Sequence, residues 1–125
     1  MANILYFGKE ELEQRASGLL KQLGHRLIAA GSYAAIADQE QCAAIVLDWY
    51  SDEDSVILGA AQRAAVPSVV ISRSIVAAFQ AGEPFADLYL EEPVDPLELA
   101  TALLELLGTP RSERERKRGI SVAAA

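Results

Sequence analysis

Short runs of consecutive apolar residues alternate along the chain with longer stretches in which apolar residues recur every three or four positions. The short runs are apolar on neighbouring positions, as is typical of parallel strands that are buried on both faces. We expect one strand in each of five runs: Ile4–Phe7, His25–Ala30, Ala43–Leu47, Ser68–Ser72 and Leu88–Leu90.

The stretches between these runs have the spacing of amphipathic helices. The first is expected to end at Gly24 and to bury Leu12, Ala16, Leu19, Leu20 and Leu23. Ser51 is a candidate N-cap for a helix that buries Val56, Ile57, Ala60, Ala61 and Ala64. Weaker patterns predict helices at Tyr33–Glu40 and around Ile75, Val76 and Phe79.

The last helix has clear signals at both ends. Asp95 is its expected N-cap, Pro96 its first residue, and Gly108–Pro110 its end. The apolar spacing predicts that the side chains facing the core are Leu97, Ala100, Leu103, Leu104 and Leu107.

Strict alternation of five strands with five helices predicts an α/β fold. Right-handed crossovers then require a doubly wound parallel sheet with helices on both faces. We expect one domain over residues 1–108, followed by a basic tail over residues 109–125. Ligands of such sheets bind at the carboxyl ends of the strands, which here carry Gly8–Lys9, Asp48, Ser72 and Glu92.

The composition narrows the possible chemistry. The chain has 125 residues with one cysteine, Cys42, and one histidine, His25, which excludes a disulfide framework and a multi-histidine metal site. No nucleophile–base pair is visible, so we expect no enzyme, no cofactor and no bound metal. The chain has no secretory signal and no apolar run long enough for a membrane span, so we expect a cytoplasmic protein without membrane contact.

Charge is distributed unevenly. The chain carries a net charge of −7, whereas the segment from Thr109 onward has five basic and two acidic residues. The acidic body would repel nucleic acid, so nucleic acid is not an expected partner. The tail is either a solvated end or an arm that docks to an acidic partner.

Several segments, taken in order over about residues 3–107, resemble the receiver domain of two-component response regulators, a flavodoxin-like (CheY-like) five-stranded fold. Leu20–His25 resembles the junction between its first helix and second strand, and Ile45–Asp48 resembles the strand that ends in the phospho-accepting aspartate. Ser72 matches the switch hydroxyl, Tyr89 the switch aromatic, and Glu92–Pro93 the place of a Lys-Pro pair. The resemblance implies a role in signal transduction and phosphorelay.

The sequence departs from that pattern at the positions that would take part in phosphoryl transfer. The resemblance places a Mg²⁺-binding acidic pair at Gly8 and Lys9, and a phosphate-binding lysine at Glu92. Glu10 and Glu11 are nearby, but we expect them to point elsewhere. Phosphoryl transfer needs cations around the transferring group, so we expect a pseudo-receiver in which Asp48 is not phosphorylated. We further hypothesise that the Lys9 ammonium lies between Asp48 and Glu92 and replaces both cations.

The expected function is phosphorylation-independent contact with a partner protein or a second copy. The resemblance places the contact face between Ser74 and Leu107, with candidate apolar contacts at Phe79, Phe85, Tyr89 and Val94. One alternative is a working regulator phosphorylated on Asp48, and another is a small-molecule-binding flavodoxin-like domain.

Each candidate residue also has a purely structural interpretation. Asp48 can be a loop or capping residue, Ser72 a turn hydroxyl, and Tyr89 a half-buried core aromatic. Cys42 is expected to be a small buried hydrophobe with no lowered pKa. Carboxylates at Asp52–Asp54 suit a helix N-terminus better than a divalent cation.

Overall fold

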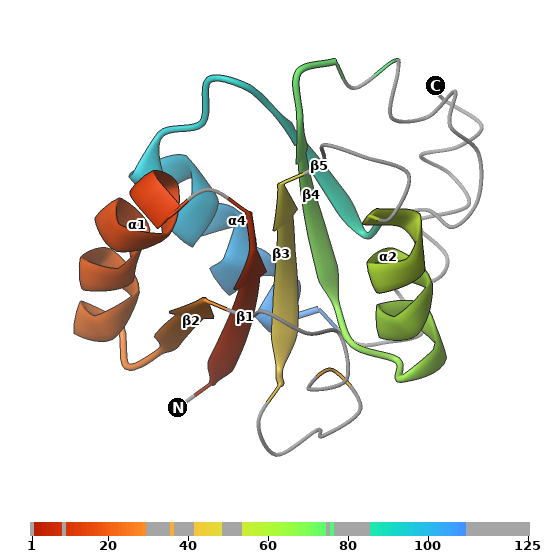
Figure 1. Cartoon of the computed structure of the whole chain (residues 1–125). Coiled ribbons are helices and arrows are strands. Elements are labelled where there is room, and N and C mark those ends of the chain that lie inside the picture. The colour runs from red at the N-terminus through yellow and green to blue at the C-terminus, as the bar shows by residue number, and fades with distance from the viewer. Residues whose placement is uncertain are drawn as a thin grey trace.

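Five parallel strands form one sheet through the centre of the molecule (Figure 1). The computed structural model describes residues 2–8, 10–29, 36, 42–48, 54–74, 76 and 86–109. The strand order is β2-β1-β3-β4-β5, with β1 at Asn3–Phe7, β2 at Arg26–Ala29, β3 at Ala44–Asp48, β4 at Ser68–Ser72 and β5 at Leu88–Glu91. Each predicted strand is confirmed to within one or two residues.

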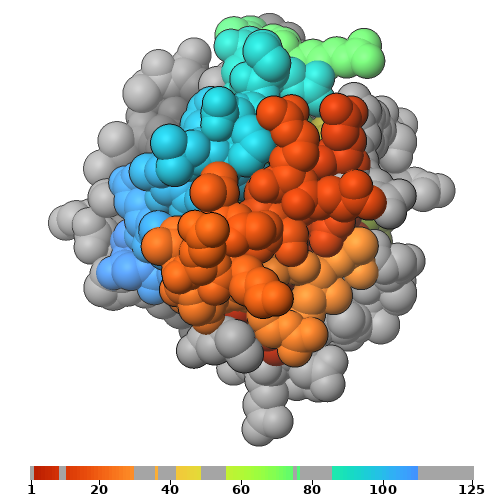
Figure 2. All heavy atoms as spheres, turned by 90° about the vertical axis from the view of Figure 1, so that its left-hand side faces the viewer, coloured from red at the N-terminus to blue at the C-terminus, as the bar shows by residue number. Residues whose placement is uncertain are grey.

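Helices cover both faces of this sheet. α1 (Glu10–Gln22) and α4 (Pro96–Leu107) lie side by side on one face, and α2 (Asp54–Arg63) lies on the other (Figures 1 and 2). The predicted doubly wound architecture is therefore confirmed. Apart from residues 36 and 76, the helices expected at 33–40 and around 75–79 lie outside the described residues, as do the Ser51 cap and the tail beyond Thr109. None of the described helices is long and apolar enough to cross a bilayer.

The central strands β3 and β4 are buried along their whole length because both of their faces are covered. On one face Tyr6 and Val46 pack with Leu20 of α1 and Leu103 of α4. On the other face the β3 and β4 side chains pack with Leu58 of α2. Continuous apolar runs were the correct signal for these strands, since a strand covered on both faces needs no alternation.

The ends of α4 agree with the sequence, whereas its buried side agrees only in part. The Asp95 carboxylate accepts the Leu97 N–H at 2.8 Å, and the Gly108 N–H donates to the Leu104 carbonyl at 3.2 Å. Leu97 and Leu104, which were expected to face inward, are 64% and 39% exposed. The prediction was wrong because a leucine-rich helix has more apolar positions than one buried stripe can hold. Ala100 and Leu103 are buried as predicted, and they are joined by Leu99 and Leu106, which the prediction missed.

The same error affects α2. Val56 was expected in the buried stripe and is half exposed, whereas Leu58, which was not, is fully buried. Ala61 is buried as predicted, and Ile57 and Ala60 are partly buried against the same cluster. Ala64 also packs against this cluster, so the periodicity identified the helix and most of its inward face, with an error at Val56 and an omission at Leu58.

Candidate functional site

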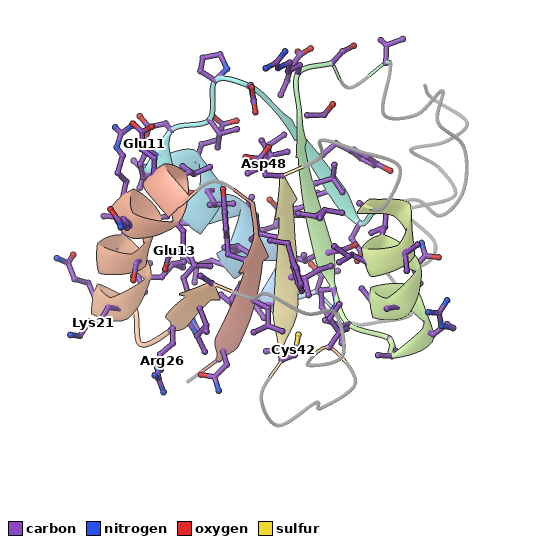
Figure 3. The ribbon with its side chains drawn as sticks, in the orientation of Figure 1. Glu11, Glu13, Lys21, Arg26, Cys42 and Asp48 are labelled. Carbon is purple, nitrogen blue, oxygen red and sulfur yellow. The ribbon has the colours of Figure 1, made fainter. Side chains whose placement is uncertain are left out.

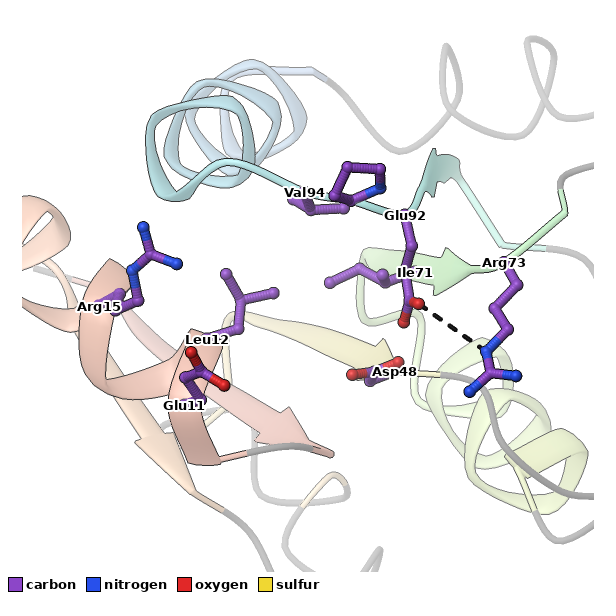
Figure 4. A pocket seen from close by; sticks show the side chains of 9 residues that line it. Glu11, Leu12, Arg15, Asp48, Ile71, Arg73, Glu92 and Val94 are labelled. Atoms are coloured by element: carbon purple, nitrogen blue, oxygen red, sulfur yellow. Dashed lines mark ion pairs between the residues drawn. The ribbon is translucent and has the colours of Figure 1, made fainter.

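A pocket of about 510 Å³ opens at the carboxyl ends of β3, β4 and β5 (Figure 4). This is the edge of the sheet at which the sequence placed the functional residues. One wall comes from the first turns of α1 and the other from the segments that follow β4 and β5. The described residues that line it are Glu11, Leu12, Arg15, Asp48, Ile71, Arg73, Glu92, Pro93 and Val94.

Asp48 lies at the inner end of this pocket as the last residue of β3 (Figures 3 and 4). It is 3% exposed although the pocket itself is open to solvent. Its register partner on β4 is Ile71, which also lines the pocket. The end of the most buried strand therefore presents a carboxylate to a partly apolar cavity.

Gly8, directly after β1, allows Asp48 to occupy this position. A Cβ atom built on Gly8 would overlap with the Asp48 Cβ and would lie 3.3 Å from its Cγ and 3.4 Å from its Oδ2. Gly8 also has a φ of +155°, which side-chain-bearing residues rarely adopt. The position at which the resemblance implies an acidic residue is therefore one where any side chain would collide with Asp48.

Glu92 points into the same pocket from the turn after β5, and its observed cationic partner is Arg73 (Figure 4). The Arg73 Nε atom lies 4.0 Å from the Glu92 Oε2 atom, and the Arg73 side chain is 86% exposed. The Glu92–Pro93 peptide bond is cis. Glu92 thus has a basic neighbour from the end of β4, whereas Lys9, which we expected to supply that charge, lies outside the described residues.

Ser72 and Tyr89, the two candidate switch residues, are both engaged in local hydrogen bonds. The Ser72 hydroxyl donates to the Ser74 carbonyl at 3.0 Å and accepts the Ser74 N–H at 3.2 Å. The Tyr89 hydroxyl accepts the Ala86 N–H at 2.9 Å, and its ring packs partly buried against the α2 side of the core. Neither residue lines the pocket. These contacts are those of a turn hydroxyl and a core aromatic.

The structure brings together some of the predicted site residues and adds others. Asp48 and Glu92 share the pocket, whereas Phe79 and Phe85 of the expected contact face lie outside the described residues. Glu11 was expected to point elsewhere and instead lines the pocket. Arg15 was missed, although it lies one helical turn after Glu11 and so shares its face.

The remaining reactive groups lie away from the pocket. The Cys42 thiol is buried before β3, at the end opposite to Asp48 (Figure 3), and burial raises its pKa to about 11. His25 accepts the Ala2 N–H through its Nδ1 atom at 3.2 Å. Among the residues that the structure describes, no three His, Cys, Asp or Glu side chains come together in a way that could hold a metal ion.

Comparison with solved structures identifies the architecture. Chemotaxis protein CheY4 of Vibrio cholerae superimposes with a TM-score of 0.67 at 18% identity, over 85% of this chain and 98% of that one. A receiver domain protein of Methanospirillum hungatei gives 0.66 at 21%, over 94% and 98% of the two chains. This chain has a receiver-domain fold. No family model and no curated protein matches its sequence.

A third receiver domain of similar structure contains a bound metal ion. The receiver domain of a sensor histidine kinase of Pseudomonas aeruginosa has a TM-score of 0.62 at 20% identity, over 86% of this chain and 98% of that one. In that structure a magnesium ion is coordinated in the active-site cleft. In the present chain Asp48 ends β3, Gly8 follows β1 and Glu92 follows β5.

Proposed function

We propose that this chain is a pseudo-receiver, a receiver-fold signalling module that works by protein–protein contact without phosphorylation of Asp48. The observation that carries the proposal is the packing of Asp48 against Gly8, because it leaves no room for a second carboxylate beside the first. The charge at Glu92 adds to this effect. The proposal includes no enzymatic activity and a cytoplasmic setting, as expected from the sequence.

The electrostatics of the pocket oppose phosphoryl transfer. Transfer to an aspartate needs cations that neutralise the incoming group, and Mg²⁺ needs hard oxygen ligands. Among the described residues that line the pocket, three are carboxylates, Glu11, Asp48 and Glu92, and two are arginines, Arg15 and Arg73. A glutamate in place of a lysine changes the local charge by two units, which at about 4 Å and an effective dielectric near 20 amounts to several kcal/mol. Arg73 offsets little of this, since it is highly exposed.

A contact role is supported by the apolar side chains that the receiver fold leaves on its surface. Leu97 and Leu104 are exposed on α4, within the segment Ser74–Leu107 that the resemblance implies as a contact face. Val94 continues this segment into the rim of the pocket. Exposed apolar side chains within one segment of a small domain indicate an interaction surface.

The metal requirement gives a direct test. We expect the amide signals of Gly8, Asp48 and Glu92 in a ¹⁵N NMR spectrum to show no saturable shift when Mg²⁺ is titrated to about 10 mM, a range in which weak carboxylate sites fill. The Asp48→Asn variant, which lacks the carboxylate charge, should behave identically. Saturable shifts in the wild type that disappear in Asp48→Asn would contradict the proposal and favour a working phosphorelay regulator.

Small-molecule binding is a second candidate because the pocket has the size of a ligand site. Its volume of about 510 Å³ falls within the usual range of roughly 300–1,000 Å³. Apolar side chains from Leu12, Ile71 and Val94 and charged groups of both signs line it. A ligand found by thermal-shift screening should lose its effect in an Ile71→Trp variant that fills the pocket. An unchanged shift in that variant would place the ligand elsewhere.

A further inference from the structure

The outer face of α4 carries a row of residues with an apolar surface, which we call the α4 stripe: Leu97, Thr101 and Leu104. These positions follow one another at four and three residues and so lie on one side of the helix. Leu97 and Leu104 are exposed, as is Thr101, whose hydroxyl donates to the Leu97 carbonyl at 2.8 Å. Since that hydroxyl is bonded to its own helix, the α4 stripe offers a partner chiefly methyl groups.

Acidic side chains follow the α4 stripe along one edge. Glu98 and Glu105 are exposed and each comes directly after one of the stripe leucines, so the two carboxylates form a parallel row two turns apart. The whole segment 86–109 contains six Asp or Glu residues and no Lys, Arg or His. The last turn of α4 has no basic residue either. The α4 stripe is therefore apolar along its centre, and the charged residues of its own segment 86–109 are all acidic.

We propose that the α4 stripe docks an amphipathic helix of a partner protein whose apolar face is flanked by Lys or Arg. This inference rests on the proposed contact function and names the chemistry of the partner. Leu97 and Leu104 are about 10.5 Å apart along the axis, two helical turns, so they match apolar residues that recur at the same period on a facing helix. Basic side chains beside that face would reach Glu98 and Glu105, and their aliphatic stems would cover the leucines.

The same charges disfavour other occupants. Two copies joined through the α4 stripe would bring two Glu98–Glu105 rows together, and like charges across an interface cost affinity. Nucleic acid and anionic lipid carry the wrong sign for an acidic surface. A basic helix alone gains from both the apolar centre and the acidic edge.

The test uses a synthetic helical peptide of Leu and Lys, about 18 residues long, with leucines on one face. Its binding to the full chain is measured by fluorescence anisotropy. We expect saturable binding that weakens about tenfold or more in Leu97→Ser/Leu104→Ser. Glu98→Lys/Glu105→Lys should weaken binding similarly and reduce its salt dependence. Circular dichroism verifies that each variant is folded.

Matched control variants separate docking from general attraction. Leu23 and Val56 are each 50% exposed, comparable to the stripe leucines, so Leu23→Ser/Val56→Ser should change peptide binding less than about twofold. Glu11→Lys, at an exposed position of α1, controls for a change of charge alone. Equal losses in the controls, or equal binding of a Leu/Glu peptide, would overturn the proposal, as would the absence of saturable binding. Self-association lost in Leu97→Ser/Leu104→Ser would assign the α4 stripe to a second copy.

The docking proposal and the pseudo-receiver proposal can fail separately. If the peptide does not bind and Asp48 accepts no phosphoryl group, the pseudo-receiver proposal stands. Only the proposal that the partner is a basic helix is then rejected. If Asp48 is phosphorylated and the peptide binds in a way that depends on the α4 stripe, the pseudo-receiver proposal is rejected and the docking proposal stands.

Discussion

The Asp48 pocket and the outer face of α4 both lie outside the apolar core, yet they differ in what they can do. In the pocket a buried carboxylate packs against a glycine that leaves no room for a second carboxylate beside it, and Glu92 stands where the resemblance implies a phosphate-binding lysine. On α4, two leucines are exposed beside a row of glutamates. In the proposed pseudo-receiver, a few side chains after the strand ends remove a chemistry while the same fold retains a surface for contact.

The sharpest way to examine α4 is to compare adjacent leucines on its two sides. Leu103 is fully buried in the core, whereas Leu104 is partly exposed. Leu103→Ala should lower the free energy of unfolding by about 2–5 kcal/mol because it leaves a cavity. Leu104→Ala should lower it by less than about 1 kcal/mol. Urea unfolding of both variants measures the difference, and equal losses would mean that α4 does not bury the side described here.

A substitution at Gly8 tests the packing around Asp48 in the same way, through its effect on the free energy of unfolding. Gly8→Asp should lower the free energy of unfolding by about 1–3 kcal/mol, because its Cβ collides with Asp48 and its backbone φ is unfavourable. It should also fail to create a Mg²⁺ site. The matched control is Gly18→Ala, since nothing lies within 4 Å of a Cβ built there in exposed α1. That variant should gain roughly 0.5–1 kcal/mol. Mg²⁺ binding by Gly8→Asp would show that one substitution suffices to rebuild the site.

Cys42 extends the comparison to the other end of β3. Its buried thiol does not line the Asp48 pocket. Burial raises its pKa from 9.0 to about 11, so the native thiol should react with iodoacetamide at pH 8 about 100-fold more slowly than in urea. A protonated thiol is favoured in the folded state. Its contribution to stability is therefore complete below pH 9 and is lost as the pH rises to about 11.

Unfolding measured from pH 8 to 11 checks that sign. The wild type should lose stability relative to Cys42→Ala over this interval. A native thiol that reacts as fast as the unfolded one would show that the β3 start is open to solvent.

The smallest effect is expected at the ion pair on the rim of the pocket. Arg73→Ala should change the free energy of unfolding by less than about 1 kcal/mol, because an exposed pair at 4.0 Å is weak. The same variant should make the pocket more negative and leave Asp48 without phosphorylation. A loss as large as that of Leu103→Ala would mean that Arg73 holds the β4 and β5 ends together.

Much of the fold was predictable because its signals are local. The strands β3 and β4 are continuous apolar runs, and the Asp95–Pro96 start of α4 is a capping pattern that needs no tertiary information. The inward side of α4 was not predictable in the same way. Leu103 and Leu104 are chemically identical neighbours, and only the position of the sheet decides which one is buried.

The site was predictable in part for a similar reason. Strand topology alone brings Asp48 and Glu92 to one edge of the sheet. The approach of Arg73 to Glu92 and the turn of Glu11 toward the pocket depend on the paths of the connecting segments, which leave no periodic signal. The close approach of Gly8 to Asp48 is also tertiary, although a glycine where the resemblance implies an acidic residue was a visible hint.

Intact-mass measurement after incubation with acetyl phosphate and Mg²⁺ tests the central claim most directly. The wild type is run beside Asp48→Asn and beside a standard receiver labelled under the same conditions. We predict no phosphoryl adduct on either form of this chain while the standard receiver is labelled. An adduct on the wild type that is absent from Asp48→Asn would contradict the account and show that this pocket transfers phosphate despite its charges.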